Sequence, residues 1–140
     1  MVLLNKVYTK TNTSPWIFNF NTNTITNYIP DPRDNTKQIY TPDEVANTLT
    51  PYINLMISLP GLQKYLSRSY IDDNTLRVTR QFDTTENAQN FITTTQYSNN
   101  SFILNYRNLI TQKLSDNNVT YTDIHYEIVD ANGNNTIITI

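Results

Sequence analysis

Residues 62–92, with the sequence LQKYLSRSYIDDNTLRVTRQFDTTENAQNFI, decide the fold. Residues 62–71 are rich in strand-forming side chains, and Asp72-Asp73-Asn74 has the composition of a turn. Residues 75–82 then alternate between apolar and polar side chains, which is typical of a strand with one buried face. The stretch therefore predicts a β-hairpin that leads directly into a helix. One face of the second strand carries Leu76, Val78, Arg80 and Phe82, and the other carries Arg77, Thr79 and Gln81.

Two helices are expected after this hairpin. Asp83 and Glu86 have the spacing of a capping box, with Asp83 as the cap. Apolar residues continue at helical spacing until residues 96–100 interrupt them. Ser101 is expected to cap a second helix that ends at residues 116–118. The predicted buried positions are Ala88, Phe91, Ile92 and Thr95 in the first helix and Phe102, Ile103, Tyr106, Leu109, Ile110 and Leu114 in the second.

The first half of the chain predicts a strand, a hairpin and a helix. Residues 2–9 form the strand, and residues 15–29 form a hairpin with its turn near residues 21–23. A loop follows, and Thr41-Pro42-Asp43-Glu44 then reads as a capping box with proline at the first helical position. Pro51 lacks the N–H that a helix interior needs, so a kink or break is expected near Thr50.

The last part of the chain predicts a further pair of strands. Residues 119–129 form a long strand, Asn132-Gly133 favours a type I′ turn, and residues 136–140 return. The whole order predicts one α+β domain over residues 1–140, with a ferredoxin-like antiparallel sheet, helices on one face and extra N-terminal and C-terminal β-hairpins. Whether residues 14–29 join the main sheet stays open.

Composition narrows the possible functions. The chain has 140 residues, no Cys, two Gly and a net charge of −2. It therefore excludes disulfide scaffolds, cysteine nucleophiles, cysteine zinc sites and glycine-rich phosphate loops. Without a basic surplus, nucleic acid is not an expected partner, and no apolar run suits a membrane span. No cofactor or metal is predicted, and the N-terminal pattern does not predict a signal peptide.

The hairpin and helix also resemble a known group of proteins. A strand begins at Pro60-Gly61-Leu62 and continues into a short hairpin. The next helix begins after an aromatic residue and a polar cap. Over residues 42–130 this resembles the antibiotic-biosynthesis-monooxygenase-like group of dimeric α+β barrels. The resemblance implies a ferredoxin-like protomer and a homodimer, and in some members cofactor-free oxidation of polycyclic or quinol substrates; others bind haem or have no known activity. The residues that carry it are Phe82, Asp83, Glu86, Ala88 and Phe91.

The overall composition resembles a second class of proteins. The chain has 21 Asn and 22 Thr, with few Gly and no Cys. This is similar to small virion and accessory proteins of marine tailed phages with AT-rich genomes. That resemblance implies a location in the cytoplasm of a host cell or in a virion, with other virion proteins as possible partners.

The catalytic candidates centre on the single histidine. Asp123 and Glu127 lie two residues on either side of His125, so the three side chains share one strand face at a spacing of about 7 Å. A carboxylate at that spacing can orient the imidazole or raise its pKa. An exposed polar strand face gives the same pattern without any catalysis.

The candidates for ligand binding are aromatic and polar residues of the predicted sheet. Four of the ten basic residues fall in one stretch, at Lys64, Arg68, Arg77 and Arg80, but positions 77 and 80 differ in parity and should lie on opposite faces. The candidate ligand-binding residues are Trp16, Tyr65, Arg77, Gln81 and His125.

Three functions remain open from the sequence. The first is a non-enzymatic structural or accessory protein, encoded by a phage, that acts through self-assembly as a dimer or larger homo-oligomer or through other protein contacts. The second is a cofactor-free monooxygenase-like enzyme of the dimeric barrel group. The third is a small module that binds a polar ligand on the Arg77–His125 face.

Overall fold

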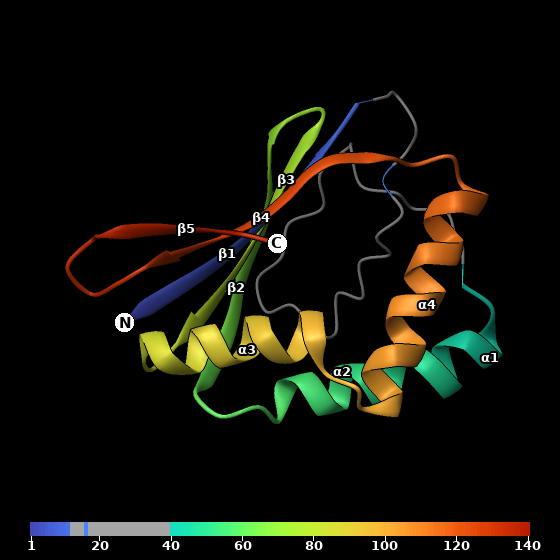
Figure 1. The fold of residues 1–140 in the computed structure, drawn as a ribbon, viewed down its shortest axis with the longest axis horizontal. Helices are drawn as coiled ribbons and strands as arrows, with labels where there is room; N and C mark the ends of the chain where they lie inside the picture. Colours follow the sequence, from blue (N-terminus) through green and yellow to red (C-terminus); the bar gives the residue numbers. More distant parts are fainter. Residues whose placement is uncertain (12–15, 17–39) are drawn as a thin grey trace.

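The chain forms a mixed α+β structure around an antiparallel sheet (Figure 1). A computed structural model describes residues 1–11, 16 and 40–140, with only the backbone at residues 65 and 66. Within this part of the chain the five strands are ordered β2-β3-β1-β4-β5. Their bounds confirm the strands that the sequence predicts there: β1 Val2–Lys10, β2 Leu62–Asp72, β3 Thr75–Phe82, β4 Tyr121–Val129 and β5 Asn135–Thr139. The hairpin predicted over residues 15–29 lies outside the described residues except for Trp16.

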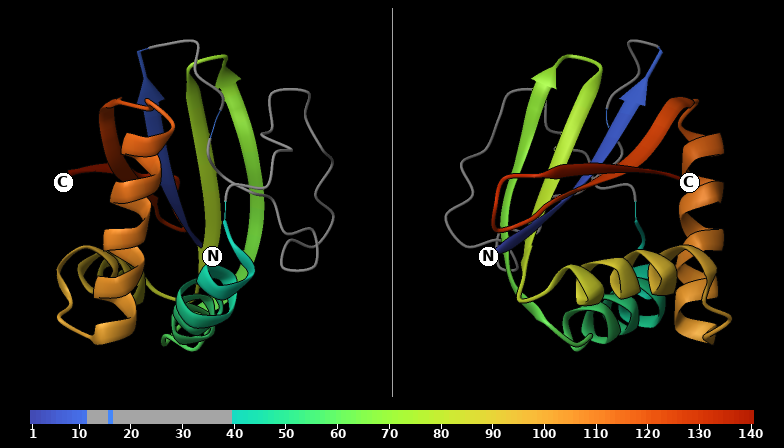
Figure 2. Two further views of the ribbon diagram at one scale, coloured as in Figure 1. Left: turned by 90° about the vertical axis from the view of Figure 1, so that its right-hand side faces the viewer. Right: turned by 60° about the vertical axis from the view of Figure 1, so that its left-hand side comes forward.

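The helical segments come from two stretches of the chain. The first is helical from residue 42 to residue 57, and the second contains two helices that flank residues 98–100. Figure 2 shows α2 and α3 at one end of the sheet and α4 running upward from that end. The bounds are α1 Pro42–Glu44, the π-helix η1 Val45–Leu49, α2 Thr50–Ile57, α3 Thr85–Tyr97 and α4 Ser101–Asp116.

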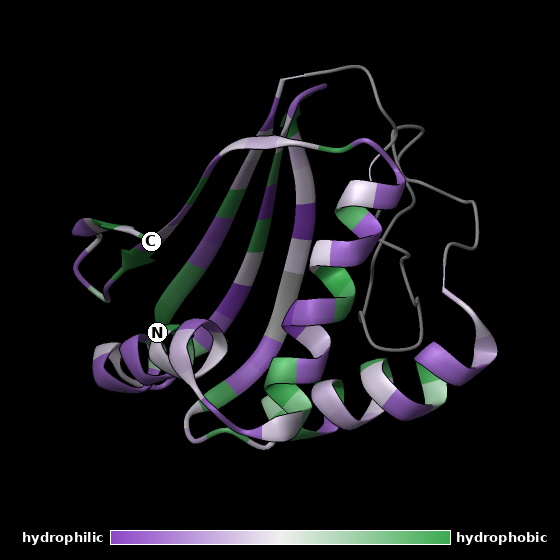
Figure 3. Cartoon of the chain, turned by 45° about the vertical axis from the view of Figure 1, so that its right-hand side comes forward, coloured by the Kyte–Doolittle hydropathy of each residue, from purple (hydrophilic) through white to green (hydrophobic). Residues whose placement is uncertain are grey.

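Strand register explains which face of the sheet is buried. Leu4 lies between Arg80 of β3 and Ile128 of β4, so these residues project to the same side. That side meets the helices, and the alternation that produces it is visible along the strands in Figure 3. The main core comprises Val2, Leu4, Met56, Phe82, Ala88, Phe91, Ile92, Ile103, Tyr126 and Ile128.

The helix that contains Pro51 does not break. The Thr41 capping box is confirmed, with Glu44 N donating to Thr41 Oγ1 and Thr41 N donating to Glu44 Oε1. At the expected break the chain instead adopts the π-helical turn η1, in which Thr50 N donates to the carbonyl of Val45. Pro51 then occupies the first turn of α2. The wider turn accommodates the proline within a continuous helical stretch, so of the expected kink or break the break is wrong, and a π-helical irregularity stands at this place instead.

Both predicted caps of the following helices are displaced by one residue. Thr84, rather than Asp83, caps α3, because its side chain accepts a hydrogen bond from Asn87 N. Asp83 instead accepts hydrogen bonds from Thr84 N and Asn87 Nδ2. Asn100, rather than Ser101, caps α4 by accepting from Phe102 N. In each case the neighbouring residue has the non-helical backbone that a cap requires.

Gly61 is required where the chain enters β2. Its φ is +80°, a conformation that side chains with a Cβ rarely adopt. A Cβ at this position would also collide with Asp83 Oδ1 and lie 2.6 Å from Asn87 Cβ. The carbonyl of Gly61 accepts from Asp83 N at 3.0 Å, so the close approach fixes the start of β2 against the start of α3.

Two further expectations are corrected. Phe102 is 47 % exposed, because Ile103 is the residue at the start of α4 that enters the core. The β4–β5 turn is not of type I′, since only Gly133, and not Asn132, has a positive φ. Gly133 N donates to the Asp130 carbonyl, and Asp130 Oδ1 accepts from the backbone N–H groups of Asn132 and Asn134.

Candidate functional site

The single histidine lies on the sheet face that is opposite to the helices, here called the open face. Its ring nitrogens meet two carboxylates of the same strand: His125 Nδ1 is 2.5 Å from Asp123 Oδ2 and His125 Nε2 is 3.2 Å from Glu127 Oε1. Both carboxylates therefore orient the imidazole, as the spacing along the strand predicts. The three side chains form a single row along β4.

This row favours a charged imidazole. Partial burial alone lowers the pKa of His125, but the hydrogen bonds to Asp123 and Glu127 outweigh burial and raise the pKa above its ordinary value. With both nitrogens directed at carboxylates, neither nitrogen keeps a free lone pair to accept a substrate proton. The geometry therefore suits a structural ion triplet better than a general base.

The open face also carries two of the other predicted ligand-binding residues. Arg77 and His125 lie on either side of Val7 in the same row of the sheet, two strands apart. Gln81 lies further along β3, where its Nε2 donates to Gln63 Oε1 at 2.6 Å. The three residues thus share a face without converging on one point.

Trp16 is not part of that surface. Trp16 is 2 % exposed and packs against Leu76 and Val78, on the helix-facing side of the sheet. Its Nε1 donates to the Asp73 carbonyl at 3.3 Å. The structure therefore separates Trp16 from His125 by the thickness of the sheet. The side chain of Tyr65 lies outside the described residues.

The basic residues of the hairpin divide between the two faces. Arg80 projects toward the helices, and the pairing of Arg68 with Val78 places Arg68 on the same side. Lys64 pairs with Gln81, so Lys64 shares the open face with Arg77. The opposite orientation of positions 77 and 80 agrees with the parity argument from the sequence.

A group of tyrosines accompanies the cations on the helix-facing side. The rings of Tyr52 and Tyr106 stack with centroids 3.6 Å apart and planes at 1°. Tyr8 and Tyr121 have centroids 5.5 Å apart, and Gln96 Nε2 donates to Tyr126 Oη at 2.9 Å. We call the set the tyrosine cluster: Tyr8, Tyr40, Tyr52, Tyr106, Tyr121 and Tyr126.

Burial raises the pKa of four tyrosines of this cluster. Burial and the Glu44 carboxylate raise the pKa of Tyr40 to about 12, while Arg68 opposes the change. Burial likewise raises the pKa of Tyr52, Tyr106 and Tyr121. These phenols therefore remain neutral near pH 7 and can act as hydrogen-bond donors. The sequence signal for this cluster was the high tyrosine content, but tyrosine content alone does not say which residues meet.

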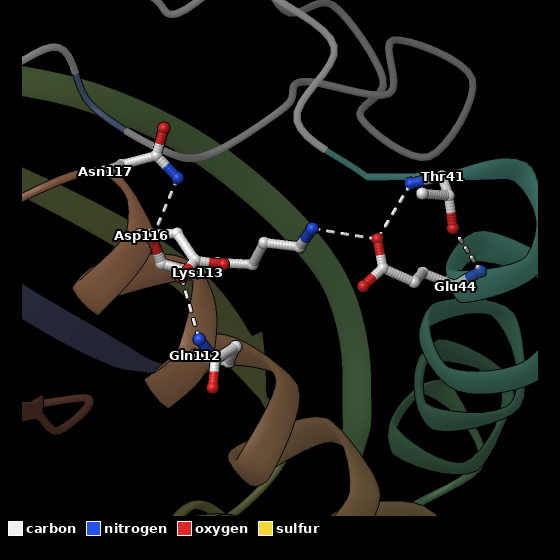
Figure 4. Close-up of polar contacts among 6 residues, drawn as sticks. All are labelled: Thr41, Glu44, Gln112, Lys113, Asp116 and Asn117. Atoms are coloured by element: carbon white, nitrogen blue, oxygen red, sulfur yellow. Dashed lines mark hydrogen bonds and ion pairs between the residues drawn. The ribbon is translucent and has the colours of Figure 1, made fainter.

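One ion pair connects the first helical segment to α4. Lys113 Nζ lies 2.8 Å from Glu44 Oε1, which also accepts from Thr41 N (Figure 4). Lys113 Nζ lies 5.7 Å from the centre of the Tyr40 ring. The hydrogen bond from Lys113 lowers the pKa of Glu44. The pair holds the N-terminal cap of α1 against the last turns of α4.

Among the strands of the described residues, the two outermost, β2 and β5, differ in their chemistry. The edge strand β5 contains no charged residue, and Ile137 is 65 % exposed. The opposite edge strand β2 has three register shifts against β3 and carries Lys64 and Arg68. Bulges and charges hinder the addition of another strand, whereas a regular uncharged edge permits it.

Within the described residues, no group of three or more His, Asp or Glu side chains could hold a metal ion. None of the helices in this part of the chain is long and apolar enough to cross a membrane. Comparisons with models of protein families, with curated proteins and with solved structures find no match to this chain.

Proposed function

We propose that the protein is a non-enzymatic structural or accessory protein that associates with a second copy of itself through the edge of β5. The observation that carries this proposal is the exposed, uncharged edge strand with Ile137 at its centre. Its asparagine-rich and threonine-rich composition fits a small virion or accessory protein.

Antiparallel pairing of two β5 strands would produce a symmetric contact. A two-fold axis at the middle residue brings Ile137 against the same residue of the second copy. The pair adds backbone hydrogen bonds along the strand and removes two isoleucine side chains from water. No charge opposes a like charge, because β5 has none.

The strand order supports a ferredoxin-like protomer as part of this proposal. The described strands include the order β4-β1-β3-β2, with β5 added beside β4. A dimer of the barrel type would close over the open face. That face carries Arg77, Gln81 and the His125 row, so it suits water or a polar contact better than a closed apolar interior. Edge pairing is therefore favoured over barrel closure.

The test compares two isoleucines on the two edges of the sheet. Light scattering over a concentration series should give a dimer, near twice 16.3 kDa, for the wild-type chain. Ile137→Lys should weaken association by about tenfold or more, because it places a charge where the proposed contact would bury an isoleucine.

Ile71→Lys is the matched control. Ile71 is 55 % exposed on the edge strand β2, so its substitution introduces the same charge at the protected edge. This variant should associate like the wild type. A wild-type monomer at every concentration, or equal effects of both substitutions, would overturn the proposal.

A further inference from the structure

The turn between β4 and β5 contains the one Asn-Gly step of the sequence, at Asn132 and Gly133. Both residues are exposed, and a Cβ at Gly133 would meet no described atom within 4 Å apart from those of its chain neighbours. A glycine therefore leaves the approach to its backbone nitrogen open. An asparagine side chain beside such a nitrogen is the arrangement from which a cyclic imide forms.

The side chain of Asn132 is not restrained. Its backbone N–H donates to Asp130 Oδ1 at 2.9 Å, but its side-chain amide makes no hydrogen bond to any residue that the structure describes. Asn100 gives the contrast, since it is also exposed and precedes a serine. Its Oδ1 accepts from Phe102 N at 2.9 Å and so caps α4. The Asn132 amide can turn toward the following nitrogen, whereas the Asn100 amide is held by the helix.

One hydrogen bond opposes a reaction at Gly133. Its N–H donates to the Asp130 carbonyl at 3.0 Å, so this contact must open before the nitrogen can react. Residues 131–136 are all exposed, and opening the turn therefore uncovers no apolar core. Exposed turns with few buried contacts open at a low cost in free energy. The hydrogen bond thus slows the reaction without preventing it.

We propose that Asn132-Gly133 is a site of spontaneous deamidation, at which Asn132 converts to aspartate or isoaspartate. The Gly133 nitrogen loses its proton to hydroxide and attacks Cγ of Asn132. An N–Cγ bond forms, the Cγ–Nδ2 bond breaks, and Nδ2 takes up a proton and leaves as ammonia. Water then opens the cyclic imide: cleavage at Cγ gives aspartate, and cleavage at the main-chain carbonyl gives isoaspartate. No atom is oxidised or reduced.

Isoaspartate lengthens the backbone in a turn that closes around Asp130. Asp130 Oδ1 accepts from Asn132 N and Asn134 N, both at 2.9 Å, and Asp130 N donates to the Asn134 carbonyl at 3.0 Å. An additional backbone carbon between Asn132 and Asn134 is incompatible with keeping all three contacts, and the new carboxylate repels that of Asp130. Among the described strands β5 pairs only with β4, so its pairing should loosen. This site goes beyond the proposed function and does not depend on it.

The test ages the wild-type chain in mildly alkaline buffer and maps its peptides by mass spectrometry. Asn132 should convert about tenfold faster than Asn100 or more, because the cap of α4 must open before Asn100 can react. Chromatographic separation of the modified peptides distinguishes isoaspartate from aspartate. Conversion of Asn132 at the same rate as Asn100, or more slowly, would overturn the proposal.

Asn132→Ser and Asn134→Ser form a matched pair in the same turn. Asn132→Ser removes the reacting amide and should abolish deamidation there, whereas Asn134→Ser keeps the Asn-Gly step and should age like the wild type. In isoaspartate chains separated from aged wild type, amide hydrogen exchange over residues 135–139 should be about tenfold faster than in fresh chains. Equal ageing of the two variants would contradict the site, and unchanged exchange would contradict the loosening of β5.

Discussion

At the scale of single residues, His125 is an ionisable group with a partner at each ring nitrogen. Asp123 and Glu127 hold its imidazole at both nitrogens. Because it is the only histidine of the chain, His125 is the main side chain that titrates near neutral pH. Because the hydrogen bonds raise its pKa in the folded state, folding favours the protonated ring.

His125→Gln should alter how stability depends on pH. In the wild type, the stabilisation from His125 is fully present below the ordinary pKa of 6.5 and is lost as the pH rises through the raised folded value. Urea unfolding between pH 5.5 and 8.5 should therefore show a free energy of unfolding that falls with pH in the wild type and stays flatter in the variant. Parallel curves for the two proteins would contradict this assignment.

The face on which a residue lies was predictable from the sequence wherever alternation along a strand decides it. The row around His125 and the opposite orientation of Arg77 and Arg80 follow from alternation along a strand. The stacking of Tyr52 on Tyr106 was not predictable in this way. It depends on how two helices, far apart in the sequence, pack against each other.

At the scale of secondary-structure elements, the cap of α3 gives a direct test. Thr84→Ala removes the acceptor for Asn87 N and should lower the free energy of unfolding by about 1 kcal/mol. Thr93→Ala changes an exposed threonine within the same helix and should be neutral or slightly stabilising, since alanine favours helices. Denaturant unfolding measures both, and equal effects would show that Thr84 does not act as the cap.

The elements themselves follow from the sequence, but their ends do not. Asp83 and Ser101 both have the chemistry of caps, and the choice between each of them and its neighbour depends on backbone conformation. The backbone of Asp83 donates to the Gly61 carbonyl, and its side chain accepts hydrogen bonds from Thr84 N and Asn87 Nδ2, so Asp83 lies just outside the helix. Pro51 similarly predicts an irregularity in the helix, and the chain accommodates the proline with a π-helical turn.

At the scale of the whole molecule, the antiparallel sheet with helices on one face was predictable from the alternation of strands and helices. The contrast between the two edges was not, because it depends on the order β2-β3-β1-β4-β5 and on the register shifts of β2. Among the described strands, that order leaves the uncharged β5 outermost, and a strand paired on both sides could not add another copy.

The cooperativity of the whole domain can be followed with Trp16, the only tryptophan. Its ring packs against Leu76 and Val78, while the main core lies around Phe82 on the same strand. Because β3 joins the two groups, Trp16 should lose its buried environment only when the sheet unfolds. Tryptophan fluorescence and far-ultraviolet circular dichroism should therefore give coincident denaturation curves, as one cooperative domain requires.

Leu76→Ala sharpens this test. Leu76 is fully buried beneath Trp16, so the truncation should cost about 2–5 kcal/mol of stability. In a single cooperative domain, both spectroscopic midpoints should move together to lower denaturant concentration. If only the fluorescence midpoint moved, the Trp16 region would unfold separately from the main core, and the chain would contain two independent units.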